Sequence, residues 1–289
     1  MSEPVAKLIE KLDAQSAHVG IIGLGYVGLP LATTCAARGF RTTGFDIDPV
    51  KIDRLDRHDS YIDAVSDDTL KHLQADGHLS WTTEMTKLAR MDVIVICVPT
   101  PLSKNRDPDL SFVRNTTKVI AEHITSGTLV VLESTTYPGT TEDVVKPILE
   151  SNGLVCGRDF LLGFSPERED PGNTAYATAT IPKVVAGDGE TATRAMTAFY
   201  GRVVDKVVPV STTQTAEAVK ISENIFRAVN IALVNELKVI FDALDIDVWE
   251  VIDAAATKPF GFMPFYPGPG LGGHCIPIDP FYLTWKARE

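Results

Sequence analysis

The residue that says most about chemistry is Cys275, which lies in a glycine- and proline-rich segment, GPGLGGHCIPIDP, between Gly268 and Pro280. Glycines let the backbone adopt positive φ angles and come close to a ligand, and this run leads directly into His274 and Cys275. A thiol presented in this way can act as a nucleophile toward a bound substrate. The same composition also fits a structural loop whose cysteine is buried.

A second motif lies near the N-terminus, where the apolar segment His18–Leu24 runs into glycines with the spacing GxGxxG and then into the helix-like stretch Leu29–Ala37. A strand, three glycines and a helix in this order are typical of a dinucleotide-binding turn. The first glycine allows a tight turn, the second admits a pyrophosphate, and the third lets the helix pack on the strand. We therefore expect cofactor contacts from Gly23, Gly25, Tyr26, Val27 and Gly28.

The end of the next expected strand, Arg41–Ile47, indicates which dinucleotide binds. An acidic residue about 20 positions after the glycines accepts a hydrogen bond from the adenosine ribose 2′-hydroxyl and repels a 2′-phosphate. Asp46 has this position, so the sequence predicts NAD rather than NADP, with Lys51 as a further cofactor contact. Alternatively, Asp46 and Asp48 form a solvated strand end, and Pro49 opens a helix.

Composition and charge agree with a globular enzyme. The chain has 289 residues, of which 44% are hydrophobic, a net charge of −11 and no basic cluster, which argues against nucleic acid or a membrane as a partner. No apolar run approaches the ~18 residues of a membrane span, and the first residues are charged rather than signal-like, so we expect a cytoplasmic protein. The four cysteines are scattered and the six histidines lack ligand spacing, so we expect neither a disulfide framework nor a metal site.

Short β-rich segments alternate with helical patterns through most of the chain. Further strands are expected at Val93–Val98, Thr128–Glu133, Phe160–Phe164, Val184–Ala186 and Val207–Val210. Helices are expected between them at Leu110–Ile124 and Thr140–Glu150. Such alternation predicts an α/β fold with a doubly wound, mostly parallel Rossmann-type sheet.

Polar residues follow several of these strands, at the edge where open α/β sheets bind their ligands. Thr100 follows one strand, Ser134 and Thr135 follow the next, and Glu167 follows the third. The hydroxyl groups also suit plain turn and capping roles, so each threonine taken alone fits either interpretation.

One long helix is expected to begin a second domain, because Thr212–Leu244 contains neither proline nor glycine. After Ile225 this segment is apolar nearly all round, which predicts a buried helix at the centre of an all-helical domain. We therefore divide the chain into an NAD-binding domain, 1–211, and a helical central domain, 212–289.

The first turns of this helix carry polar residues on one face, since Lys220 and Asn224 are an i, i+4 pair and Glu217 lies on the same stripe. A lysine and an asparagine entering an apolar helix are costly unless they meet polar partners. The alternative is a solvated first turn with an ordinary Glu217–Lys220 pair. Two shorter helices follow, Val248–Thr257 and one that Asp279 is expected to cap.

Six segments together resemble one known family. They are the glycine motif at Gly23, CVPTP (97–101), ESTTYPGTTE (133–142), FSPEREDPGN (164–173), the helix with Lys220 and Asn224, and GPGLGGHCIPIDP (268–280). The resemblance, which spans practically the whole chain, is to the UDP-glucose and GDP-mannose dehydrogenases. In detail it is nearest to the bacterial UDP-N-acetylglucosamine 6-dehydrogenase branch, which makes a uronic acid for surface polysaccharides. Members of the family normally continue into a C-terminal domain that holds much of the UDP, and this sequence stops before it.

The resemblance implies a four-electron oxidation of a sugar C6 alcohol to a carboxylate, with two NAD⁺ and no free aldehyde. Cys275 would attack the C6 aldehyde to give a thiohemiacetal, and then a thioester that water hydrolyses. Lys220 would stabilise the developing oxyanion, with Asn224 as a hydrogen-bond donor. Asp279 and Thr135, which also contacts the cofactor, would position water.

The resemblance offers two candidates for the general base. Glu167 would act as general base or water organiser. Some UDP-glucose dehydrogenases carry a second glutamate four residues later, where this sequence has Pro171, and Glu169 is a possible substitute.

Two other interpretations compete with this one. A β-hydroxyacid dehydrogenase also combines a Rossmann domain with a Lys/Asn helix, but it performs one two-electron step and needs no cysteine. A noncatalytic NAD-binding fragment is the other alternative. We expect a homodimer or higher homo-oligomer through the long central helix, and NAD binding with little UDP-sugar oxidation by these 289 residues alone.

Overall fold

The computed structural model describes residues 2–168, 178–273 and 276–289. The chain forms two compact units. The first unit comprises residues 1–101 and 109–220, and the second unit comprises residues 102–108 and 221–289. None of the described helices is both long enough and apolar enough to cross a lipid bilayer.

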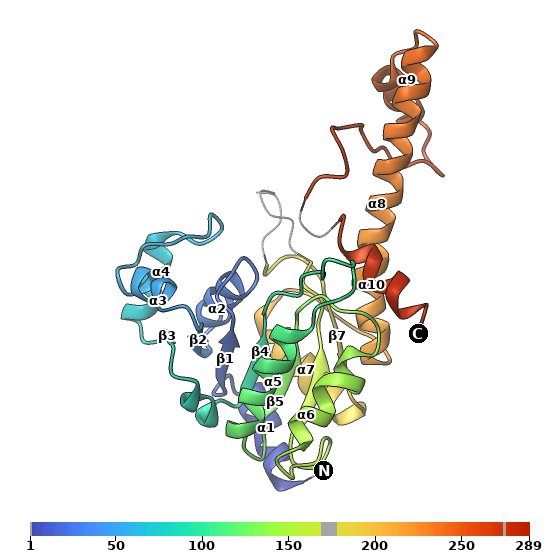
Figure 1. Ribbon diagram of the computed structural model, residues 1–289. Coiled ribbons are helices and arrows are strands. Elements are labelled where there is room, and N and C mark those ends of the chain that lie inside the picture. Colours follow the sequence, from blue (N-terminus) through green and yellow to red (C-terminus); the bar gives the residue numbers. More distant parts are fainter. Residues whose placement is uncertain (1, 169–177, 274–275) are drawn as a thin grey trace. The chain divides into compact units, whose positions relative to one another are not determined.

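The first unit is built on a sheet of eight strands in the order β3-β2-β1-β4-β5-β6-β7-β8 (Figure 1). The strands are β1 (His18–Ile22), β2 (Arg41–Phe45), β3 (Leu79–Thr82), β4 (Val93–Ile96), β5 (Leu129–Leu132), β6 (Leu161–Phe164), β7 (Lys183–Gly187) and β8 (Val207–Pro209). Neighbouring strands are parallel except β6 and β7, which are antiparallel. The predicted doubly wound, mostly parallel Rossmann-type sheet is confirmed.

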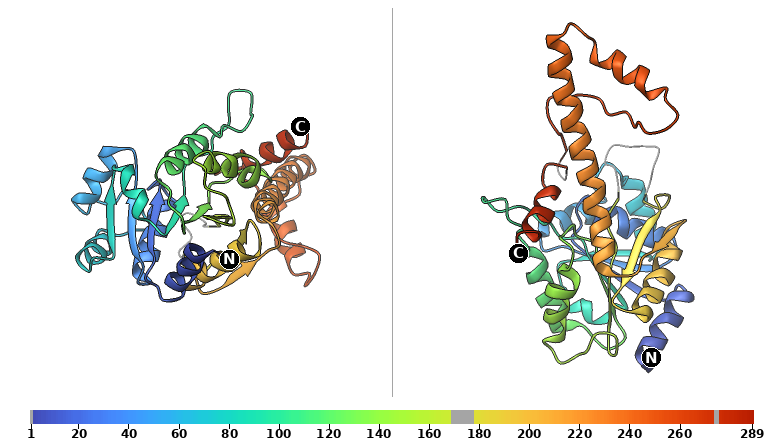
Figure 2. Two further views of the ribbon diagram at one scale, coloured as in Figure 1. Left: turned by 90° about the horizontal axis from the view of Figure 1, so that it is seen from below. Right: turned by 90° about the vertical axis from the view of Figure 1, so that its right-hand side faces the viewer.

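Helices cover both faces of this sheet (Figures 1 and 2). One face packs against α1 (Glu3–Asp13), α2 (Gly28–Ala37) and α7 (Glu190–Val203), and the other against α5 (Ser111–His123) and α6 (Lys146–Glu150). Along β4, alternate residues enter the two hydrophobic cores, so every residue of its VIVI sequence is buried. A strand buried on both faces needs apolar side chains throughout, which explains the continuous apolar runs in the sequence.

The structure adds elements that the sequence pattern did not predict. They are β3, α4 (Asp67–Ala75) beside it, and the 3-10 helix Met85–Arg90. The helix α3 (Pro49–Asp56), also beside β3, begins at Pro49 as the alternative interpretation expected. The single helix expected over Thr140–Glu150 is instead a π-helical turn, Thr141–Val145, followed by α6. Pro147 in the first turn of α6 has no N–H to donate, so a regular hydrogen-bond ladder cannot run through it.

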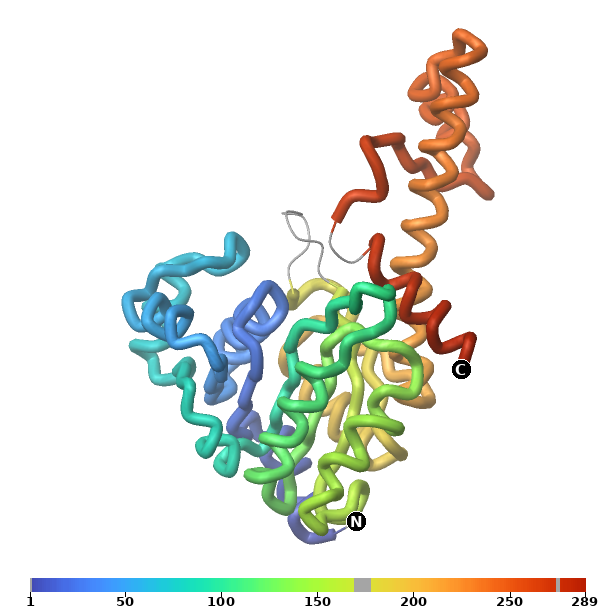
Figure 3. Tube along the Cα trace, viewed as in Figure 1, coloured from blue at the N-terminus to red at the C-terminus, as the bar shows by residue number. Residues whose placement is uncertain are grey.

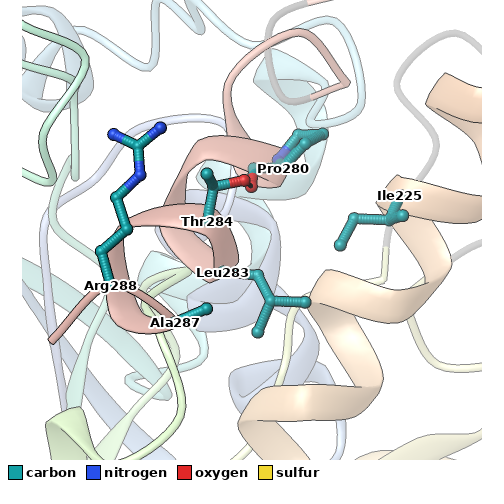
Figure 4. A pocket seen from close by; sticks show the side chains of 6 residues that line it. All are labelled: Ile225, Pro280, Leu283, Thr284, Ala287 and Arg288. Carbon is teal, nitrogen blue, oxygen red and sulfur yellow. Dashed lines mark hydrogen bonds between the residues drawn. The ribbon is translucent and has the colours of Figure 1, made fainter.

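The second unit contains most of α8 (Thr213–Ala243), then α9 (Val248–Ala256) and α10 (Asp279–Lys286). After α9 the chain returns alongside α8 (Figure 3), where Asn235 accepts a hydrogen bond from the Gly268 N–H at 2.9 Å. Near the start of α8, Ile225 and Leu283 of α10 point toward one another across a small groove (Figure 4). An all-helical unit on one long helix is confirmed.

The expectation that α8 is buried along its length is wrong for this chain. Five large apolar residues on α8 are between 48% and 67% exposed: Phe226, Val229, Leu233, Val239 and Ile240. The core of the second unit is small, centred on Val234, Val248 and Ile252. The apolar pattern of the helix is therefore wider than the surface that its own chain covers.

The start of α10 also differs from the prediction. Ile278 is the N-cap and Asp279 is the first helical residue, with Pro280 after it. Asp279 is therefore not the N-cap residue, and its carboxylate accepts a hydrogen bond from the Asn224 side chain.

Candidate active site

The carboxyl ends of the parallel strands form one edge of the sheet, and the order of the strands reverses at β1, which pairs with both β2 and β4. Ligands of open α/β sheets bind at such a switch point. The expected cofactor residues follow these strands: the Gly23–Gly28 loop follows β1, Asp46 follows β2, and Thr100 follows β4. Their placement fits a dinucleotide site.

The three glycines of the loop meet different surroundings. Gly23 has φ +92°, and a Cβ there would lie 2.6 Å from the Cys97 carbonyl oxygen. A Cβ on Gly28 would lie 1.8 Å from the Gly23 carbonyl oxygen, so only glycine lets α2 approach β1 so closely. A Cβ on Gly25 would meet no atom within 4 Å. The open space at Gly25 suits a pyrophosphate that needs close access to the backbone.

The N-terminus of α2 faces the same loop. Val27 occupies the N-cap position, and no side chain in the described part of the chain caps the helix there. Uncapped N–H groups and the helix dipole favour a phosphate at this end. Tyr26 next to it is 68% exposed, so its ring is available to a ligand.

Asp46 is 5% exposed, and its carboxylate ties the glycine loop to the end of β2. Oδ2 accepts hydrogen bonds from the Leu24 N–H at 2.9 Å and from Lys51 Nζ at 2.8 Å. Oδ1 accepts one from the Asp48 N–H at 3.0 Å. A carboxylate has about four acceptor positions, so these contacts leave room for a ribose hydroxyl.

The alternative interpretation of this strand end holds for Asp48 but not for Asp46. Asp48 is the N-cap of α3, its side chain accepts from the Val50 N–H, and Pro49 is at the start of the helix. Asp46 is buried rather than solvated.

Thr135 and Glu167 follow β5 and β6 at the same edge of the sheet. Thr135 is half-buried, and Glu167 is 8% exposed. The Glu167 carboxylate accepts from Lys183 Nζ at 3.3 Å, a partner that the sequence motifs did not indicate. Lys183 also contacts Glu133. The signal that could have revealed this cluster is a charged residue directly at the end of an apolar strand, in both KVVAG and LVVLE.

Glu217, on the first turns of α8, is fully buried, so the alternative of a solvated turn with a Glu217–Lys220 pair is wrong. Its carboxylate accepts from the Gly139 N–H at 2.6 Å and from the N–H and hydroxyl of Thr141 at 2.9 and 2.7 Å. Burial raises the pKa of Glu217 to about 7, although these three donors act in the opposite direction. This carboxylate ties α8 to the segment after β5.

Lys220 is 8% exposed, and its Nζ has no hydrogen-bond or ion-pair partner among the described residues. A largely buried lysine can provide a counter-charge to a bound anionic group. This environment fits a lysine that acts on a bound substrate.

Asn224, one turn further along α8, is 1% exposed and donates a hydrogen bond to Asp279, which is 3% exposed. Arg227 donates to the Asn224 side-chain oxygen, which fixes the orientation of the amide. The structure thus brings together two predicted catalytic residues that are 55 positions apart and that we expected to have different roles. Cys275 lies outside the described residues.

The comparisons with known proteins agree with this geometry. Residues 17–204 match the NAD-binding domain of the UDP-glucose/GDP-mannose dehydrogenase family, and residues 214–289 match its central domain. The chain is 43% identical to the Staphylococcus aureus protein CapL and 39% identical to the Pseudomonas aeruginosa UDP-N-acetyl-D-glucosamine 6-dehydrogenase. Each alignment covers 94% of this chain and 63% of the relative.

A solved structure is similar as well. The UDP-D-ManNAc dehydrogenase from Pyrococcus horikoshii has a TM-score of 0.89 and 36% identity, over 94% of this chain and 65% of that one. The chain therefore spans about two thirds of the length of the relatives it matches. With both of their characteristic domains present, the chain belongs to the UDP-glucose/GDP-mannose dehydrogenase family.

Proposed function

We propose that this chain carries the catalytic part of an NAD-dependent UDP-sugar 6-dehydrogenase, which oxidises the C6 alcohol of a UDP-hexosamine to a carboxylate. The observation that carries the proposal is the buried contact between Asn224 and Asp279. It joins the helix with Lys220 to the start of α10, four residues after Cys275. Buried polar groups need hydrogen-bond partners, and this contact supplies one to each of the two residues.

The dinucleotide is proposed to bind through the Gly23–Gly28 loop, with its pyrophosphate over Gly25 and its adenosine ribose on Asp46. We propose Tyr26, Lys51, Thr100 and Thr135 as further contacts. Bound NAD supplies a hydride acceptor for each of the two oxidation steps.

Cys275 is the proposed nucleophile. After the first oxidation its thiolate adds to the C6 aldehyde carbon, which gives a thiohemiacetal with a new oxyanion. Removal of a hydride from that carbon gives a thioester. Water then adds to the thioester carbon, the C–S bond breaks, and the thiol is regenerated with the acid.

Lys220 and Asn224 are proposed to stabilise negative charge on the C6 oxygen during these steps. Lys220 suits this role because it is buried without a counter-charge among the described residues. Arg227 restrains the Asn224 amide, so the nitrogen that donates has a defined direction. An oriented donor needs no reorganisation as charge develops.

Asp279, Thr135 and Glu167 are proposed to orient the hydrolytic water, with Glu167 as the base that takes its proton. Of the two carboxylates, Glu167 is the more exposed, at 8% against 3% for Asp279. Asp279 also accepts a hydrogen bond from Asn224. The alternative base Glu169 and the position of Pro171 lie outside the described residues.

The proposed substrate is UDP-N-acetylglucosamine. Relatives named for UDP-N-acetylglucosamine and for UDP-N-acetylmannosamine match the chain at similar identity, 39% and 36%. Turnover rates measured with UDP-N-acetylglucosamine and with UDP-N-acetylmannosamine would therefore identify the substrate. We also propose a location in the cytoplasm, where nucleotide sugars are made.

The exposed apolar residues of α8 support the proposal that two chains associate through this helix. Val229 and Leu233, which are 61% and 53% exposed, lie one turn apart. An apolar stripe of this kind is typical of an interface. Sedimentation at increasing concentration should show a dimer or larger species, and Leu233→Glu should shift it toward monomer.

Calorimetry and an NADH assay test the function. We expect the 289 residues by themselves to bind NAD, and to oxidise UDP-N-acetylglucosamine slowly or not at all. Contacts with the remote uridine part of a substrate normally hold its reacting carbon in place, and in this family much of the UDP site is expected outside these residues. Failure to bind NAD would contradict the proposal, and NAD binding without any oxidation under forcing conditions would favour a noncatalytic role.

A further inference from the structure

Four buried polar residues form a cluster in the first unit, and the proposed mechanism uses only one of them, Glu167. Lys183 is 4% exposed, and its Nζ lies 2.9 Å from Oε2 of Glu133 and 3.3 Å from Oε2 of Glu167. Tyr200 of α7 donates a hydrogen bond to Oε1 of Glu133. We call Lys183, Glu133, Glu167 and Tyr200 the lysine cluster.

Sheet topology explains why the lysine cluster forms. Glu133 and Glu167 follow β5 and β6, which are parallel, so they leave the sheet at the same edge. β7 is antiparallel to β6, so its first residue, Lys183, begins at the edge where β6 ends. The antiparallel strand β7 therefore places Lys183 beside Glu133 and Glu167, which follow the parallel strands β5 and β6.

The two carboxylates of the lysine cluster differ in access. The Glu133 side chain is 0% exposed, and each of its oxygens accepts from one donor, Lys183 or Tyr200. The Glu167 side chain is 11% exposed, and its Oε1 accepts from the Arg168 N–H at 2.6 Å. Glu133 is closed to any substrate, whereas Glu167 retains a path to one.

Electrostatics keep the lysine charged. Burial lowers the pKa of Lys183, but Glu133 and Glu167 raise it by more, so the net shift is upward. Burial raises the pKa of Glu133, and Lys183 opposes that shift. A buried ion pair of this kind is destabilising if one partner is removed, because the remaining charge has no counter-ion.

We propose that Lys183 is a positioning residue for Glu167, which it holds in one orientation at the ligand-binding edge of the sheet. Glu133 accepts a hydrogen bond from the Lys183 ammonium group and is itself held by Tyr200. These contacts restrain the ammonium group at the edge of the sheet where Glu167 lies. The step it serves is hydrolysis: water adds to the thioester carbon, the C–S bond breaks, and Glu167 takes the proton of the water. The link to this step rests on the proposed function, whereas the contact between Lys183 and Glu167 does not.

Two substitutions in the lysine cluster should act in opposite directions. Glu133→Gln removes the competing carboxylate and leaves Lys183 to Glu167 alone, so Glu167 should hold its proton less readily. Lys183→Met removes the cation that the two carboxylates share, so the pair should take up a proton at a pH about 1–3 units higher than in the wild type. Glu133→Gln leaves one cation and one anion, and it is expected to fold even if Lys183→Met does not.

The measurement is a pH titration of the chain labelled with ¹³C at the glutamate carboxyl carbons, followed by NMR. The Glu167 signal is identified by its loss in Glu167→Gln. We expect its midpoint to fall in Glu133→Gln and to rise in Lys183→Met. Lys7→Met is the control, because it breaks an ion pair with Glu3 in which the side chains are 65% and 79% exposed, and it should leave the signal unchanged.

Midpoints that stay within about 0.3 units of the wild type in both variants, or that move in the same direction, would overturn the proposal. A second readout is the pH profile of acid formation, whose acidic limb should move as the NMR midpoint moves. A limb that stays fixed while the midpoint moves would overturn the role in hydrolysis. If the wild type forms no acid at all, the proposed function fails, and the titration still decides the role of Lys183.

Discussion

Gly28 lies directly against Gly23, so that a Cβ on Gly28 would come within 1.8 Å of the Gly23 carbonyl oxygen. Gly25 between them has open space where its own Cβ would be. The loop therefore contains one glycine needed for packing and one for which we propose a ligand contact, and substitution should separate the two roles.

Gly28→Ala should destabilise the fold, since the overlap with Gly23 forces α2 away from β1. Overpacking of this kind costs about 1–3 kcal/mol in the free energy of unfolding. Gly25→Ala should change that free energy by less than about 0.5 kcal/mol, yet weaken NAD binding by roughly tenfold or more. Denaturant unfolding and NAD calorimetry on both variants measure this. Loss of stability in Gly25→Ala together with loss of NAD binding alone in Gly28→Ala would contradict the roles assigned to the two glycines.

Asp46→Ala should weaken the binding of NAD by roughly 1–3 kcal/mol, because a charge-assisted hydrogen bond is lost. It should also relax discrimination against NADP. Because Asp46 also accepts from the Leu24 N–H, the variant should lose some stability, which sequence reasoning did not predict. Asp59→Ala is the control, because it removes a carboxylate from an exposed ion pair with Arg54 and should leave NAD binding unchanged. Unchanged affinity for NAD in a folded Asp46 variant would show that the carboxylate serves the loop alone.

Glu217 should make stability depend on pH. Its pKa rises from 4.5 in the unfolded chain to about 7 in the folded protein, so the folded state binds the proton more tightly. The resulting stabilisation is fully present below pH 4.5 and is lost as the pH rises through about 7. Glu217→Gln should flatten this part of the stability curve. Melting temperatures of both proteins between pH 4.5 and 8 provide the test, and parallel curves would contradict it.

Lys220→Ala should reduce turnover far more than NAD affinity, since its charge matters most as an oxyanion develops. Lys238→Ala on the same helix is the control and should change neither. We would measure NAD binding by calorimetry and the rate of NADH formation with UDP-N-acetylglucosamine. Equal losses of binding and turnover, or a loss explained by unfolding, would return Lys220 to a structural role.

Local sequence patterns predicted most of the fold because the strands of a doubly wound sheet are apolar on both faces. Their expected ends were long by one or two residues in several cases, as for β4, where Cys97 and Val98 follow the last paired residue. The edge strand β3 was missed because its sequence, LSWT, is short and only partly buried. The exposure of α8 was not predictable, since an apolar helix face does not reveal what covers it.

Candidate site residues could be proposed from the sequence where they are close together along the chain, as in the glycine loop and Asp46. The lysine cluster was missed because Lys183 and Glu133 are 50 positions apart and meet only through the reversed strand β7. Glu217 was noticed, but its partners at Gly139 and Thr141 depend on a turn 76 to 78 positions away. Long-range polar contacts follow from topology rather than from local pattern.

The ratio of NADH formed to UDP-N-acetylglucosamine consumed tests the central claim most directly. Slow turnover by the 289 residues alone does not alter this ratio, so it can be measured at high protein concentration. Four-electron oxidation predicts two NADH for each sugar converted to the acid. Cys275→Ser should lower the rate of acid formation by at least about 10²-fold. One NADH for each sugar, with a free aldehyde or ketone as product and full activity in Cys275→Ser, would contradict the account.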